Sequence, residues 1–315
     1  MLTGRHGWSR QQQGIALVLV LWVVVLLSVI AGAMAMAQRT GVIMTGNIRQ
    51  DREARALVDA GLNFMVLMLE RRNQLGQDNR WPVDGRLHPW VFGKKNIWVA
   101  AMPENARIDL NLVDQSVLQS LLHSVGLEEE QAMAVRDAIL DWRDTDDVVH
   151  EWGAEDPEYY ADGRPIGARD TPFLSVEELQ QVMGVSPDLY RKLALTLTVD
   201  ARQSMVNPAF ASREVLLAMP DATAEEVDAY LLERQQMLDQ GLPVTAPTFG
   251  GGSLRVRAGS RFRLFAEVDL LDGRKAQGMM VVGIESRTSK GYRVLQKHYG
   301  KFQSLGRIVP AQEGN

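Results

Sequence analysis

An uncharged run of 23 residues, Ile15 to Ala37, constrains the fold of this chain more than any other feature. As an α-helix rising about 1.5 Å per residue, it would measure about 34 Å, which exceeds a bilayer hydrocarbon core of about 30 Å. Few soluble folds bury a helix that is apolar on every face, so a core helix is disfavoured. The preceding residues 1–14 contain two arginines and no acid, so the positive-inside rule keeps them cytoplasmic. We therefore predict a membrane-spanning segment over residues 15–37.

A secretory signal peptide is the main alternative to this retained anchor. The segment Ala35-Met36-Ala37 before Gln38 has the small-x-small pattern of a signal cleavage site. The apolar run is longer than the roughly 7–15 residues of a usual signal-peptide core, so the retained anchor is favoured. Gly14 also ends the short basic leader directly before the apolar run, where a signal peptide has no cleavage site.

A basic leader ending in Gly14, followed by Ile15 and further apolar residues, resembles the class III leader of type IV pilins and pseudopilins. The resemblance implies that a prepilin peptidase cleaves between Gly14 and Ile15 and that Ile15 is then N-methylated. Most members of that superfamily carry Glu at the fifth mature position, where this chain has Leu19. A subunit without that Glu resembles the K-type minor pseudopilin of type II secretion systems, the general secretion pathway protein K family.

Helical periodicity continues past the membrane segment to about residue 72, with one apolar stripe to bury. A polar connector follows, and residues 96–101 are predicted to form a strand. The pattern then turns helical from Asn111 to about Gly241, and a Pro/Gly-rich linker occupies residues 243–252.

Beyond the linker the apolar period changes to two, which is typical of a half-buried antiparallel sheet. Residues 254–270 alternate in this way, and Asp272-Gly273 is a hairpin-turn signal. Further strands are predicted over residues 279–284 and 292–296.

We predict an α+β fold in which a pilin-like long N-terminal helix packs on a small antiparallel sheet and a large all-α insertion contains helix-hairpin-helix-like units. The predicted domains are a leader over residues 1–14, a transmembrane segment over 15–37, a pilin-like α+β domain over 73–110 and 242–315, and an inserted helical domain over 111–241. The insertion is a second resemblance to the K-type family, supported by the segments Arg107–Asn111, Ala138–Asp144, Gly153–Asp156 and Phe173–Leu179.

Nucleic-acid binding is the leading alternative function, because helix-hairpin-helix turns such as the one at Gly184 use backbone N–H groups to hold phosphate. Charge argues against it: residues 111–200 contain 19 Asp or Glu and 6 Arg or Lys, a net charge of −13 against −5 for the whole chain. DNA binding without a basic surface lacks its main attractive term. We therefore expect structural hairpins and no nucleic-acid partner, with a membrane-anchored DNA-uptake protein as the alternative.

Nine acids lie between Asp141 and Asp162 with one base, Arg143. A solvated acidic loop is one interpretation. A calcium site is the other, because Asp144-x-Asp146 with Glu155 at the twelfth position partly matches a calcium loop, although the EF-hand turn glycine is missing. The chain has no cysteine, so oxygen ligands favour Ca²⁺ over a transition metal. The resemblance to the K-type family also implies calcium, and the predicted ligands are Asp144, Asp146, Asp147, Glu155 and Asp156.

Catalytic motifs give no support to an enzyme. The five histidines lack zinc spacing, and neither a Gly-x-Ser-x-Gly elbow nor a phosphate loop occurs in the sequence. We therefore expect an assembly protein. The resemblance implies a single-pass protein of the bacterial inner membrane, with its globular part in the periplasm. It also implies a role in capping and initiating the pseudopilus, with other minor pseudopilins and the prepilin peptidase as partners and the exported cargo as a further candidate.

Overall fold

The computed structural model describes residues 11–72, 74, 76, 80–240, 242–257, 259–270, 273–285 and 291–300. It divides into two compact units, residues 1–56 and 57–315, which we treat separately. Helix α1, Gln11–Glu70, supplies most of the first unit and the beginning of the second. It ends close to the residue 72 expected from the sequence. The first ten residues of the predicted leader lie outside the described residues.

The first unit carries an apolar stretch of helix α1. Leu17–Gln38 has a mean hydropathy of 2.9, and its side chains are exposed. A soluble helix of this composition would bury at least one face. The stretch therefore fits a single-pass membrane anchor, as predicted.

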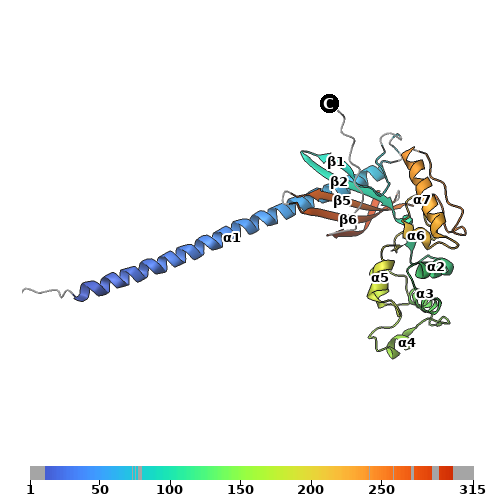
Figure 1. Ribbon diagram of the computed structural model, residues 1–315, viewed down its shortest axis with the longest axis horizontal. Coiled ribbons are helices and arrows are strands. Elements are labelled where there is room, and N and C mark those ends of the chain that lie inside the picture. The colour runs from blue at the N-terminus through green and yellow to red at the C-terminus, as the bar shows by residue number, and fades with distance from the viewer. Residues whose placement is uncertain are drawn as a thin grey trace, which may run out of the picture. The chain divides into compact units, whose positions relative to one another are not determined.

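The second unit is built on a five-stranded antiparallel sheet with the strand order β1-β2-β5-β6-β7. Figure 1 shows these strands as one layer beside the C-terminal turns of helix α1. The strands are β1 His88–Phe92, β2 Lys95–Pro103, β5 Arg261–Asp269, β6 Lys275–Ile284 and β7 Tyr292–Tyr299. The predicted antiparallel sheet is confirmed, with the central β5 alternating between buried and half-buried positions along most of its length.

Helix α1 packs against this sheet through the apolar stripe that the sequence predicted. Val58, Leu62 and Met65 are buried in one cluster with sheet residues such as Val99 and Leu264. Gly61 allows the close approach, because a Cβ at this position would lie 2.8 Å from Ile97 Cγ2 and 3.0 Å from both Val99 Cγ1 and Ala266 Cβ. The pilin-like arrangement of helix on sheet follows from this contact.

Residues 104–260 lie between β2 and β5, two strands that are neighbours in the sheet but far apart in the sequence. Most of the regular elements in this segment are helices. Its elements are η2 Glu104–Ala106, β3 Ile108–Asp109, α2 Gln115–Ser124, α3 Glu129–Arg143, α4 Asp156–Ala161, η3 Val176–Gln181, α5 Pro187–Leu193, β4 Leu197–Thr198, α6 Arg213–Leu217 and α7 Ala224–Asp239. Strands β3 and β4 form a short parallel pair.

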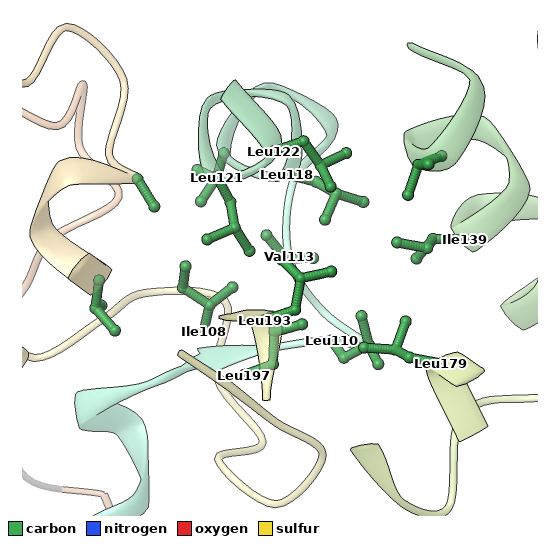
Figure 2. Packing of buried hydrophobic residues seen from close by; sticks show 14 of the residues in the cluster. Ile108, Leu110, Val113, Leu118, Leu121, Leu122, Ile139, Leu179, Leu193 and Leu197 are labelled. Atoms are coloured by element: carbon green, nitrogen blue, oxygen red, sulfur yellow. The ribbon is translucent and has the colours of Figure 1, made fainter. Parts of the chain in front are cut away.

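The helical segment has its own apolar core, shown in Figure 2. Leu118, Leu121 and Leu122 of α2 are fully buried together with Ile139 of α3 and Leu179 of η3. These residues lie within the stretch from Asn111 to about Gly241 that the sequence predicts to be helical, and that prediction is confirmed. Because this core is separate from the helix-on-sheet core, the segment behaves as a distinct packing region within the second unit.

Three tight turns in this segment have left-handed backbone conformations. Gly126 joins α2 to α3 with φ +98°, Gly184 precedes α5 with φ +80°, and Asp221 joins α6 to α7 with φ +58°. Asp is one of the few residues besides Gly that tolerates this region. The hairpin between α6 and α7 therefore keeps a left-handed turn with Asp221 in place of Gly, and the helix-hairpin-helix-like units are present.

Two strand predictions need correction. Residues 254–257 do not join the antiparallel sheet: Leu254 forms only an isolated parallel bridge with Val206, and the neighbouring Ala258 lies outside the described residues. The alternating pattern fails there because the backbone pairs with the loop before α6 instead of with a strand. The segment predicted as a connector before residue 96 also ends in an additional strand, β1, which pairs with β2 across a turn containing Gly93 at φ +61°.

Candidate metal centre

The acidic loop identified in the sequence runs from the end of α3 to the loop after α4. Its apolar support is a pair of large buried residues, Trp142 of α3 and Tyr159 of α4, whose ring centroids are 5.7 Å apart. The Tyr159 hydroxyl also accepts a hydrogen bond of 3.0 Å from the backbone N–H of Met183. The loop is thus attached to the helical core at both of its ends.

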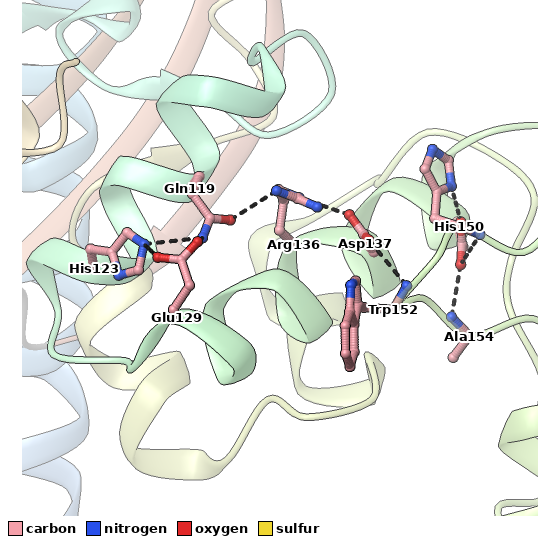
Figure 3. A network of polar contacts seen from close by, with 9 residues as sticks. Gln119, His123, Glu129, Arg136, Asp137, His150, Trp152 and Ala154 are labelled. Atoms are coloured by element: carbon pink, nitrogen blue, oxygen red, sulfur yellow. Dashed lines mark hydrogen bonds and ion pairs between the residues drawn. The ribbon is translucent and has the colours of Figure 1, made fainter.

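Two carboxylates of α3 hold the middle of this loop, and Figure 3 labels one of them, Asp137, together with the loop residues His150, Trp152 and Ala154. Asp141 is fully buried, and its carboxylate accepts hydrogen bonds from the backbone N–H groups of His150 at 3.2 Å and Ala154 at 2.7 Å, as well as contacting the His150 ring. Asp137, one helical turn earlier, accepts from the backbone N–H of Trp152 at 3.2 Å. These two residues are one turn apart on the buried face of α3, so they order the loop as a unit.

Three carboxylate oxygens near this loop are buried without a hydrogen-bond partner among the described residues. They belong to Asp144 (Oδ1), Glu155 (Oε1) and Asp170 (Oδ1). Glu155 is only 4% exposed, although its backbone N–H and its role as N-cap of α4 are satisfied through Glu158. A buried carboxylate oxygen without a donor is unfavourable, because desolvation is not repaid. A bound cation would remove that penalty.

The pKa values of the same residues also favour a bound cation. Burial, followed by repulsion from Asp141 and Asp170, raises the pKa of Glu155 to about 7. Burial and the neighbouring Asp146 and Asp141 raise the pKa of Asp144. The pKa of Asp170 is also raised, first by burial and then by Asp147 and Asp156. Several carboxylates are therefore close enough to repel one another when ionised.

Two glycines leave room for carboxylates of the cluster. A Cβ on Gly153 would overlap the carboxylate of Asp141, and a Cβ on Gly167 would overlap that of Asp156. Neither glycine has a left-handed φ, so backbone conformation does not require Gly there. A residue larger than Gly at either position would occupy the space that the carboxylate now fills.

The five predicted ligands differ in how deeply they are buried. Glu155 is buried and Asp144 is half-buried, while Asp146, Asp147 and Asp156 are exposed around them. Asp146 accepts a hydrogen bond of 3.0 Å from the backbone N–H of Val148, which leaves it oxygens to spare.

Two further acids lie at this candidate site that the sequence pattern does not predict as ligands, Asp141 and Asp170. Asp170 lies outside the dense acidic stretch, and its φ of +57° is unusual for a residue other than Gly. Asp141 begins the dense acidic stretch, and its position on one helix face with the apolar Ala138 and Trp142 is the signal in the sequence for a buried carboxylate. One oxygen each of Asp141 and Asp144 and a ring nitrogen of His150 lie within 4.8 Å of one another.

The donor set indicates which ion these residues could hold. Carboxylate oxygens dominate it, and Ca²⁺ prefers six to eight such oxygen ligands. His150 is the one nitrogen ligand near the cluster within the described residues, and its Nδ1 already contacts Asp141. The residues therefore fit Ca²⁺ better than a transition metal.

The predicted leader-cleavage residues belong to the first unit. The backbone of Gly14 and Ile15 lies within α1, and their side chains are not described. Leu19, which stands where most pilins have Glu, is 62% exposed on the same helix.

A helix with one apolar membrane-spanning stretch, packed on a small antiparallel sheet that carries a helical insertion, defines a pseudopilin-like class of protein. Residues 99–201 match the family model for protein K of the type II secretion system. The chain is similar to the type II secretion system protein K of Pseudomonas aeruginosa, with 26% identity over 97% of both chains, and to that of Aeromonas hydrophila, with 30% identity over 59% of this chain and 62% of the relative. In fold it is similar to a chain of the GspK-GspI-GspJ complex from enterotoxigenic Escherichia coli, with a TM-score of 0.53, 16% identity and coverage of 82% of this chain and 98% of that one.

The family model and the curated relatives thus both indicate similarity to the type II secretion system protein K family. This similarity agrees with the resemblance stated from the leader, Leu19 and the insertion.

Proposed function

We propose that this protein caps the pseudopilus of a type II secretion system and initiates its assembly. The observation that carries the proposal is the position of the insertion: 157 residues, from 104 to 260, leave and re-enter the sheet between the adjacent strands β2 and β5. An insertion of that size at the sheet hinders the stacking of a further subunit above this one. A subunit that accepts neighbours on one side only belongs at the end of a fibre.

Leu19 supports the same role. Other pilin-like subunits use an acid at this position to engage a neighbour's N-terminal amine, and an aliphatic side chain has no such charge. Leu19 is exposed on α1, so packing within the chain does not explain why a leucine stands at this position. A first subunit has no preceding neighbour to engage, and it therefore tolerates Leu there.

The partners proposed for this chain are the other minor pseudopilins, with the exported protein as a further partner at the tip. The similar Escherichia coli protein was solved in a complex with GspI and GspJ. The test is co-expression of the full chain with the I- and J-type pseudopilins of its own secretion system, followed by affinity capture in detergent and a gel-shift assay with duplex DNA. We expect a stable complex and no DNA binding at physiological salt. Tight DNA binding without capture of the pseudopilins would instead support the DNA-uptake alternative.

Processing by prepilin peptidase and residence in the inner membrane belong to the same proposal. We expect an intact-mass measurement of the protein purified from its host membrane to give a chain that begins with N-methylated Ile15. A mature N-terminus at Gln38 would contradict the proposal and support a secretory signal peptide. Replacing Gly14 by a larger residue should leave the leader attached, whereas the same replacement at Gly4 should not.

Calcium is the proposed ligand of the acidic loop, held by Asp144, Asp146, Asp147, Glu155 and Asp156 together with Asp170. The ion would neutralise mutually repelling carboxylates and pull the loop together, which is a role that disulfides fill in many exported proteins. The chain has no cysteine for that purpose. The buried oxygens of Asp144, Glu155 and Asp170 support this proposal. Its test is thermal unfolding of the full chain with Ca²⁺ or with EGTA, and an unchanged melting temperature would contradict it.

A further inference from the structure

A second polar site lies away from the acidic loop, where the loop before α6 meets the segment before β5. It is a pocket of about 620 Å³, lined by residues that include Gln203, Ser204, Arg255, Arg257 and Ser260. That volume is within the usual range for ligand pockets in proteins. No carboxylate is among the residues that line it.

Backbone hydrogen bonds hold the two arginines in place. The N–H of Val206 donates to the Ser253 carbonyl at 2.9 Å, and the N–H of Arg255 donates to the Val206 carbonyl at 2.9 Å. Asn105, which is buried, donates from its Nδ2 to the Arg257 carbonyl at 2.8 Å and to Gln203 Oε1 at 3.2 Å. The backbone at the pocket is therefore fixed by hydrogen bonds, so the positions of both arginines do not depend on exposed side chains alone.

The charges of Arg255 and Arg257 are not compensated within the described residues. Both side chains are exposed, and neither forms an ion pair with a carboxylate there. The next two arginines along the chain differ: Arg261 pairs with Asp200 at 3.0 Å, and Arg263 pairs with the buried Glu104. Two unpaired guanidinium groups at one pocket indicate an anionic ligand, and Arg is the side chain best suited to hold a carboxylate by two parallel hydrogen bonds.

The neutral lining residues favour a peptide over a free phosphate. Ser204 and Ser260 each carry a hydroxyl oxygen that can accept a hydrogen bond. A fully ionised phosphate offers no donor to these oxygens, whereas a peptide offers backbone N–H groups. The combination of cationic donors and neutral acceptors therefore favours a peptide carrying a carboxylate.

We propose that this pocket binds an acidic segment of another polypeptide, with Arg255 and Arg257 holding its carboxylates and Ser204 and Ser260 contacting its backbone. The charge of the neighbouring helical region also favours binding of an acidic segment at this pocket. Residues 111–200 have a net charge of −13, so an acidic segment is repelled from the helical region and attracted to the arginines.

The test uses the full chain in detergent and a fluorescein-labelled nine-residue peptide in which Glu alternates with Thr. We expect it to bind at low salt and to bind more weakly as salt rises, whereas the same peptide with Gln for Glu should bind at least about tenfold more weakly. The double variant R255Q/R257Q should lose a similar factor. The double variant R191Q/R293Q removes the same charge from exposed arginines that pair with Asp188 and Glu285, and it should bind like the unchanged protein.

A charge reversal separates recognition from misfolding. R255E/R257E should reject the Glu peptide and bind its Lys counterpart, which a merely unfolded protein would not do. Equal binding of the Glu and Gln peptides, or equal loss in both double variants, would overturn the proposal. Full competition by inorganic phosphate at the concentration of the peptide would also overturn it, because the pocket would then recognise a free anion and not a polypeptide.

Discussion

At the scale of single residues, the carboxylate of Asp141 decides how the acidic loop is ordered. It is fully buried, and it replaces water with two backbone N–H donors and the His150 ring. Burial raises the pKa of Asp141, while its hydrogen bonds from His150 and Ala154 work against that shift. A buried carboxylate of this kind is stabilising only as long as every one of its partners is present.

We predict that Asp141→Ala lowers the free energy of unfolding by about 3 kcal/mol, because it leaves buried N–H donors of the loop without acceptors. Chemical denaturation followed by circular dichroism measures the change. Asp188→Ala is the matched control, since Asp188 is 79% exposed and pairs with the exposed Arg191. Equal stability of the two variants would show that the loop is not held through Asp141.

The pKa of Glu155 predicts a pH dependence of the ion-free protein. Burial and nearby acids raise this pKa from 4.5 to about 7 in the folded state, so folding favours the protonated form. The contribution of protonated Glu155 to the free energy of unfolding is therefore fully present below about pH 4.5 and is lost as the pH rises through about 7. With EGTA present, the melting temperature should fall across this window, and added Ca²⁺ should remove the fall. Glu155→Gln should remove the part of the fall that extends to about pH 7, while other acids with raised pKa values, such as Asp144 and Asp170, keep their smaller contributions. An unchanged profile in that variant would assign the fall to those other groups.

At the scale of elements, the contact between helix α1 and the sheet depends on the absence of a side chain. Gly61 faces Ile97, Val99 and Ala266 at distances too short for a larger residue. From the sequence alone, Gly61 is an unfavourable helix residue by about 1 kcal/mol relative to Ala. The packing of α1 on β2 and β5 explains why it is there.

Gly61→Leu should lower the free energy of unfolding of the purified protein by about 1–3 kcal/mol, because it forces the helix away from the sheet. Thermal unfolding in detergent provides the measurement. Gly46→Leu lies on the same helix, where no atom is within 4 Å of the added Cβ, and it should be neutral or slightly stabilising. A neutral Gly61→Leu would mean that the helix adjusts without cost.

At the scale of the whole second unit, buried polar residues join the helical region to the sheet. Glu104, 1% exposed, accepts hydrogen bonds from Arg263 of β5 at 3.1 Å and from Thr198 of β4 at 2.6 Å. Burial disfavours its charge, but Arg263 and Arg107 outweigh that effect and lower the pKa of Glu104. Burial and the like charge of Arg263 lower the pKa of Arg107 to about 10. These contacts fasten the helical region to the sheet through β4 and β5.

We predict that Glu104→Gln lowers the free energy of unfolding by about 3 kcal/mol, because Arg263 and Arg107 keep buried charges without a counterion. Limited proteolysis should then cut the connections near residues 104 and 260 earlier than in the unchanged protein. Asp228→Asn breaks the exposed pair with Arg213 and should leave both measurements unchanged. If cleavage at these connections is not accelerated, the two regions are held together by other contacts.

The sequence alone determined the membrane helix, the helical stripes, the change of period to two and the acidic loop, because each depends on residues close together in the chain. Tertiary structure alone decided which segments meet. It paired β2 with β5 across 157 residues, withdrew residues 254–257 from the sheet by pairing them with the loop before α6, and brought Asp170 to the loop near Glu155. It also placed Asn105 beside Gly259 and Gln203. Such contacts join residues that are far apart in the chain, and they depend on how the helical region packs against the sheet. Local sequence patterns carry no information on that packing.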